Sequence, residues 1–97
     1  MNTKTNLKKL WNYLTGAFEQ EEIVAGFANA IENFEYDPNT IDDKMIDALP
    51  EDKARDLFFN VADMSFTQLF GGDFEAWHDV LKNRLGFDAE TIELLDF

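Results

Sequence analysis

The sequence has no cysteine and no long apolar run. Without cysteine, neither a disulfide nor a thiolate metal site can form. No stretch approaches the ~20 consecutive apolar residues that a membrane-spanning helix needs. The first residues, MNTKTNLKKLWNYL, also lack the apolar segment of a signal peptide. We therefore expect a soluble cytoplasmic protein that has no membrane partner.

Positive charge is scarce, with 8 basic against 20 acidic side chains and a net charge of −12. Residues 1–16 carry Lys4, Lys8 and Lys9 and no acid, so residues 17–97 hold all 20 acids against 5 bases. Such a surface repels the phosphates of nucleic acids and of anionic membranes, which argues against direct nucleic-acid binding. The same field would attract a basic protein partner and speed its association.

The two-residue alternation of β-strands is also missing, and the apolar residues recur at helical spacing. Leu7, Leu10 and Leu14 share one side of a helix, and so do Phe74 and Trp77. A content of 45% apolar residues supports one folded domain over residues 1–97. We predict an all-α, compact single-domain bundle of about six or seven short helices, near 3–15, 18–34, 38–48, 50–63, 66–70, 74–85 and 89–95.

Helix ends are marked by capping residues and glycines. Asp37, Asp73 and Asp88 can each accept backbone N–H bonds at a helix start, and Ser65 is predicted to begin the short helix 66–70. The Gly71-Gly72 pair and Gly86 can adopt the left-handed conformation that ends a helix.

Motifs for catalysis or metal binding are absent or incomplete. The stretch DPNTIDDKMIDA fails the calcium-loop pattern, because Asp42 stands at the required glycine and Ala48 at the closing glutamate. His78 is the single histidine, and with no cysteine it cannot complete a zinc site. There is no G-x-S-x-G, P-loop or G-x-G-x-x-G motif. We expect no enzyme activity, no metal and no cofactor.

The clearest polar stripe lies on the predicted helix 50–63, where Asp52, Asp56 and Asp63 share one side with Phe59 at its border. Asp43 and Asp47 form a further like-charged pair at helical spacing. Most charge runs are simply solvated faces, and for this stripe that reading has the same weight as a binding surface. A binding surface is favoured here because these like-charged acids repel one another and few basic residues offset the repulsion. The predicted partner-binding residues are Asp52, Asp56, Phe59, Asp63, Asp43 and Asp47.

In composition alone, the chain resembles the small acidic inhibitors made by phages and mobile elements. The resemblance implies an inhibitor that mimics DNA and occupies the basic surface of a nucleic-acid-handling protein. Asp52 to Asp63 places three carboxylates over about 16 Å of helix, against roughly five phosphates on one DNA strand. Mimicry would therefore require several segments to pool their acids on one face.

An alternative is a helical interaction or dimerisation module whose contact surface is apolar. The chain has more large aromatic side chains than a domain this small easily hides, and some could form an exposed patch for a partner or a homodimer. The candidates for this patch are Tyr13, Phe59, Phe66, Phe70 and Phe97.

Overall fold

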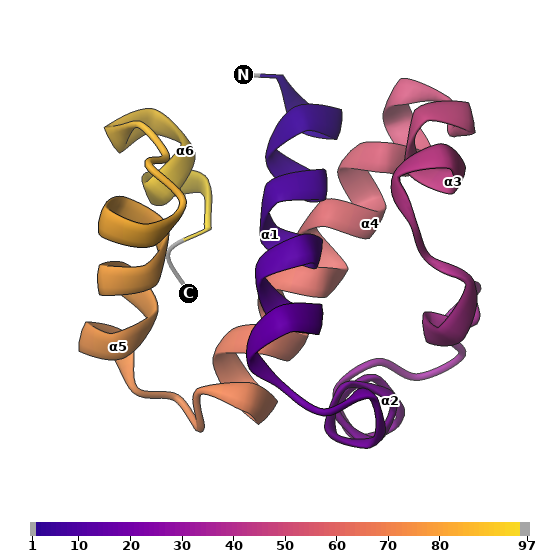
Figure 1. Cartoon of the computed structure of the whole chain (residues 1–97), viewed down its shortest axis with the longest axis horizontal. Coiled ribbons are helices and arrows are strands. Elements are labelled where there is room, and N and C mark those ends of the chain that lie inside the picture. Colours follow the sequence, from indigo (N-terminus) through magenta and orange to yellow (C-terminus); the bar gives the residue numbers. More distant parts are fainter. Residues whose placement is uncertain (1, 96–97) are drawn as a thin grey trace.

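The computed structural model describes residues 2–95, and the first helix runs through the centre of the fold. The elements are α1 (Thr3–Ala17), α2 (Gln20–Ala30), a 3-10 turn (Pro38–Thr40), α3 (Asp43–Ala48), α4 (Glu51–Met64), α5 (Phe74–Asp79) and α6 (Ala89–Leu94). Figure 1 shows α4 crossing behind α1, with α2 and α3 on one side of α1 and α5 and α6 on the other. The described residues contain no strand. The predicted all-α fold class is confirmed.

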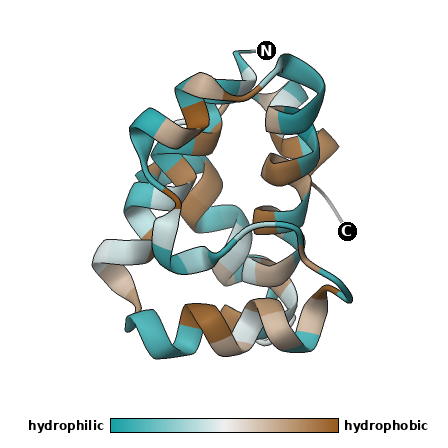
Figure 2. Ribbon diagram, turned by 90° about the vertical axis from the view of Figure 1, so that its right-hand side faces the viewer, coloured by the Kyte–Doolittle hydropathy of each residue, from teal (hydrophilic) through white to brown (hydrophobic). Residues whose placement is uncertain are grey.

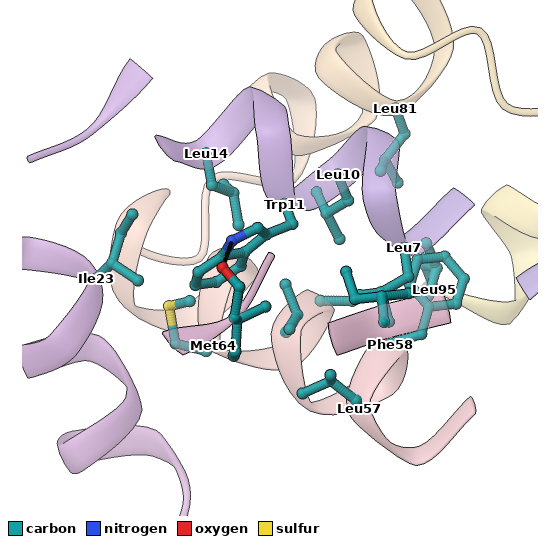
Figure 3. Close-up of a cluster of buried hydrophobic side chains, with 14 of the residues drawn as sticks. Leu7, Leu10, Trp11, Leu14, Ile23, Leu57, Phe58, Met64, Leu81 and Leu95 are labelled. Atoms are coloured by element: carbon teal, nitrogen blue, oxygen red, sulfur yellow. Dashed lines mark hydrogen bonds between the residues drawn. The ribbon is translucent and has the colours of Figure 1, made fainter. Parts of the chain in front are cut away.

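The core is built around α1, because its apolar residues fall on successive turns of one face. Leu7, Leu10 and Leu14 are completely buried against α4, which contributes Leu57 and Phe58. Figure 3 shows these side chains gathered between the helices. In Figure 2, hydrophilic and hydrophobic residues occur within the same helices, as amphipathic packing around one core requires.

Both tryptophans are buried, and each donates its indole N–H to the backbone of a distant segment. Trp11 Nε1 donates to the Ile41 carbonyl oxygen at 3.0 Å, and Trp77 Nε1 donates to the Leu95 carbonyl oxygen at 3.3 Å. A buried indole N–H needs such an acceptor. These bonds hold the segment before α3 and the end of α6 against the core.

The helix predicted over residues 18–34 is shorter than expected, because α2 ends at Ala30. Asn33 then takes a positive φ of 57°, which turns the chain back on itself. As a result Phe34 stacks on Phe27 with ring centroids 4.3 Å apart. Seven residues of continuous helix would instead separate these two positions by about 10 Å.

The helix predicted over residues 38–48 is divided in two. Asp37 does cap a start, accepting from the Asn39 N–H at 2.9 Å, but only the 3-10 turn follows it. The chain is extended at Ile41, which is buried. Asp42 then caps α3 by accepting from the Met45 N–H at 2.8 Å. The helix is interrupted at Ile41, where the side chain is buried in the core and the carbonyl oxygen accepts from Trp11.

The predicted helix start at Ser65 is wrong. Ser65 has helical φ and ψ, and its buried hydroxyl donates to the Val61 carbonyl oxygen at 2.7 Å. Helix α4 therefore continues into a wider π-helical turn, Ser65–Leu69, instead of ending and starting again. Apolar contacts on both sides of residue 65 keep the helix continuous. The Ser65 hydroxyl finds its hydrogen-bond acceptor in the preceding turn of the same helix.

The same type of ending occurs twice. After the Ser65–Leu69 turn, the Phe70 N–H donates to the Ser65 carbonyl, and positive-φ Gly71 and Gly72 follow. Helix α5 continues into the π-helical turn Val80–Arg84, where the Leu85 N–H donates to the Val80 carbonyl before positive-φ Gly86. The glycine stops and the caps at Asp73 and Asp88 are confirmed.

Candidate partner-binding surface

The α4 stripe, which consists of Asp52, Asp56, Phe59 and Asp63, lies on the face of α4 opposite its buried residues. The buried face is formed by Ala54, Leu57, Phe58 and Val61. Asp52 and Asp56 are exposed, and Phe59 and Asp63 are half-buried. The helical period of 3.6 residues produces this separation, because positions 52, 56, 59 and 63 recur on successive turns.

The carboxylates of the α4 stripe are uncompensated. Among residues 2–95, the side chains of Asp52, Asp56 and Asp63 make no ion pair and no hydrogen bond. Phe59, the aromatic residue of the stripe, is partly covered by Arg55, whose guanidinium lies 5.5 Å from the centroid of the Phe59 ring. The stripe is therefore an electrostatic surface more than an apolar one.

Asp43 and Asp47 differ from the acids of the α4 stripe, because both of their carboxylates have partners within the fold. Asp47 Oδ1 forms an ion pair with Lys8 Nζ of α1 at 2.8 Å, and Asp43 Oδ1 accepts from Asn12 Nδ2 at 3.1 Å. The hydrogen bond from Lys8 to Asp47, with the Asp47 and Asp43 charges, raises the pKa of the lysine above 10.5. A partner that contacts Asp47 would compete with Lys8.

A hollow of about 180 Å³, here named the loop hollow, lies where the segment 31–36 meets α4. Its charged lining consists of Glu32 and Glu35 from the segment and Lys53 and Asp56 from α4. The remaining residues that line it are Ile31, Asn33, Phe34, Tyr36 and Asn60. Asp56 thus belongs both to the α4 stripe and to the loop hollow, and two further carboxylates join it there.

Sequence reasoning assigned no binding role to Glu32, Glu35 or Tyr36. The chain was expected to be helical up to residue 34, which would have carried these residues away from α4. The turn at Asn33 brings them back instead. The clearest local sign of this turn is Asn33 itself, since asparagine adopts positive φ more readily than other non-glycine residues.

A second, wider hollow of about 450 Å³ adjoins the first. Both are lined by Ile31, Phe34 and Tyr36, but the second is completed by α2 and Pro38. Glu32 is its one charged lining residue. The residues that line it include no histidine, lysine or arginine, and its polar groups come from Glu32, Asn33 and Tyr36.

The aromatic candidates for an apolar patch are mostly engaged with the core. Tyr13, Phe59, Phe66 and Phe70 are half-buried, and Phe97 lies outside the described residues. Phe66 and Phe70 contact buried Trp77, with ring centroids 6.3 and 5.4 Å away. The more exposed large apolar side chains of residues 2–95 are Phe74, at 43%, and Leu94, at 41%.

His78 lies beside Phe74, with the two ring centroids 4.1 Å apart. Its Nε2 atom is buried and has no hydrogen-bond partner among the described residues. Residues 2–95 contain no group of three or more His, Cys, Asp or Glu side chains placed to hold a metal ion. In the same part of the chain, no helix is both long enough and apolar enough to cross a bilayer.

Comparison with protein-family models, curated proteins and solved structures finds no match to this chain.

Proposed function

We propose that this protein is a cytoplasmic, non-enzymatic inhibitor that binds the basic surface of a nucleic-acid-handling protein through the α4 stripe. The observation that carries the proposal is the row of uncompensated carboxylates of Asp52, Asp56 and Asp63 on the outer face of a well-packed helix. In a complex these carboxylates would form ion pairs with arginine or lysine side chains, as the phosphates of a nucleic acid do.

The loop hollow adds support, because mimicry requires acids from more than one segment. Glu32 and Glu35 of the 31–36 segment line the same hollow as Asp56 of α4. The acidic surface therefore extends beyond one helix. In contrast, Asp43 and Asp47 contact α1, so we assign them a secondary role at its edge.

The proposal is tested by capturing partners on the immobilised protein at low salt from cells that make it. A captured nucleic-acid-binding protein is then mixed with labelled duplex DNA, and the acidic protein is added as competitor. We expect displacement of the DNA, with an affinity that falls steeply as salt increases. Binding that is insensitive to salt, or partners with no affinity for nucleic acid, would contradict the proposal.

Two matched variants distinguish the contribution of the α4 stripe to binding from the effect of the net charge of the protein. The stripe variant is D52N/D56N/D63N, and the control is E75Q/E90Q/E93Q, which changes the net charge equally at exposed positions on α5 and α6. We expect the stripe variant to raise the Kd for the partner roughly tenfold and the control to raise it about twofold or less. Equal losses in both variants would show that only net charge matters.

A second candidate function is the apolar interaction or dimerisation module. The observation that favours it is the exposure of Phe74 and Leu94, although the half-buried aromatics expected to form the patch pack against the core. This function predicts a particle size that increases with protein concentration and persists at high salt. Light scattering over a range of protein concentrations distinguishes it from the acidic inhibitor.

A further inference from the structure

We infer that the loop hollow is the anchor point of the acidic surface and receives one arginine side chain of the basic partner. This inference rests on the proposed function and deepens it. Interfaces of this kind concentrate their binding energy in a few side chains that fill pockets, and arginine is among the commonest of them. The loop hollow is a concave feature that adjoins the α4 stripe through Asp56.

The size of the loop hollow suits one side chain. Its volume of about 180 Å³ corresponds to roughly six water molecules at about 30 Å³ each. An arginine side chain beyond Cβ has about the same number of non-hydrogen atoms. Pockets for cofactors and drug-sized ligands typically span about 300–1,000 Å³, so the loop hollow is too small for a nucleotide.

The chemistry of the lining suits a planar cation. Three residues that carry carboxylates, Glu32, Glu35 and Asp56, line the hollow together with the half-buried Tyr36. Carboxylates accept two parallel N–H bonds from a guanidinium, and aromatic rings attract its face. The acids come from two separate segments, Glu32 and Glu35 from residues 31–36 and Asp56 from α4, so the arrangement is not a run of neighbouring acids on one helix.

Lys53 also lines the hollow and is exposed. Within the described residues it makes no ion pair, so its ammonium is not fixed to any one of the three carboxylates. An entering guanidinium would be repelled by this charge. Removing it should therefore improve binding of a cation, which a purely structural role of the hollow would not produce.

The test uses N-acetyl-arginine N-methylamide as probe and the citrulline analogue, which has the same shape without the charge, as its control. Binding is followed by NMR of backbone amides at low salt. We expect shifts concentrated at residues 32–36 and 53–60 with the arginine probe and none of comparable size with the citrulline probe. Equal responses to both probes, or arginine-induced shifts spread over the whole surface, would overturn the inference.

Three variants sharpen the result. E32Q/E35Q removes two carboxylates of the hollow and leaves the α4 stripe intact, E90Q/E93Q makes the same charge change on α6, and K53Q removes the competing cation. We expect the Kd for the arginine probe to rise at least about fivefold in E32Q/E35Q, to change less than about twofold in E90Q/E93Q, and to fall in K53Q. An unchanged or weakened affinity in K53Q would contradict the inference.

Failure here is distinguishable from failure of the proposed function. If D52N/D56N/D63N loses its partner while E32Q/E35Q binds that partner as E90Q/E93Q does, the inhibitor function stands and the arginine anchor is wrong. If the unaltered protein captures no nucleic-acid-binding partner at low salt, the proposed function itself is wrong.

Discussion

At the level of single residues, two helical glycines have opposite surroundings. A Cβ atom on Gly16 of α1 would meet nothing within 4 Å. A Cβ atom on Gly26 of α2 would lie 2.8 Å from Met64 Sδ, and Met64 is completely buried. Gly26 therefore allows α2 to approach the end of α4 closely, whereas Gly16 has no such role.

These surroundings predict effects of opposite sign for the same substitution. We expect Gly16→Ala to stabilise the protein by about 0.5 kcal/mol, because alanine is the better helix former. We expect Gly26→Ala to destabilise it by about 1 kcal/mol, because overpacking against Met64 outweighs that gain. Urea unfolding of the two variants measures both effects. Equal stabilisation by both substitutions would show that Met64 moves aside without cost.

At the level of elements, helix starts depend on single aspartates. Asp88 caps α6 by accepting from the Thr91 N–H at 2.8 Å. The Thr91 side chain and then its backbone N–H hold the pKa of the Asp88 carboxyl below its ordinary value of 3.8. Because the native pKa is lowered, the ionised cap stabilises the fold above pH 3.8 and this contribution is lost as the pH falls through the native pKa.

The variant Asp88→Asn tests this linkage, since asparagine keeps a capping oxygen and cannot ionise. We expect it to be less stable than the unaltered protein at neutral pH. The difference should begin to shrink as the pH falls below 3.8, where Asp88 of the unfolded chain becomes protonated, and should be lost as the pH falls through the lower pKa of the native carboxyl. Urea midpoints measured from about pH 7 to about pH 3 follow the difference. A difference that stays constant over this range would contradict the assignment.

Elements also show where local patterns mislead. The signals that placed Asp73 and Asp88 at helix starts are confirmed, because a cap needs only its own first turn. Ser65 carries the same kind of signal and lies inside a helix, since packing on both sides of it overrides the local preference. Conversely, the helix predicted through Phe34 ends at Ala30, because stacking on Phe27 requires the chain to turn back.

At the level of the whole molecule, a net charge of −12 is held within a body of 29 × 26 × 23 Å. Among the described residues, one close contact joins opposite charges, the ion pair of Lys8 with Asp47. The remaining repulsion opposes the compact state. The protein therefore has a charge distribution that lowers its stability.

Salt is expected to act on stability and on binding in opposite directions. Increasing NaCl from about 20 mM to about 500 mM shortens the Debye length from roughly 20 Å to roughly 4 Å and screens the repulsion. We expect the Tm to rise by several degrees, while affinity for the proposed basic partner falls. Thermal unfolding in NaCl and KCl, which avoid the stabilising effect of sulfate, measures the first effect. A Tm that falls with added salt would show that repulsion is not a significant term.

The sequence by itself determined the all-α class, most helix spans, three of the caps and the glycine stops. These features depend on residues within one or two turns of each other, so periodicity and capping chemistry are sufficient to predict them. It also placed Asp52, Asp56 and Asp63 on an outer face, because that follows from helical period alone.

Only the tertiary structure decided which acids are free and which are used. Lys8 and Asn12 of α1 contact Asp47 and Asp43, which lie 39 and 31 residues later in the chain, and a contact at such a separation leaves no local pattern. The turn at Asn33 places Phe34 against Phe27 and brings Glu32 and Glu35 to the same hollow as Asp56. The acidic surface is thus a property of how α2, its following segment and α4 pack together.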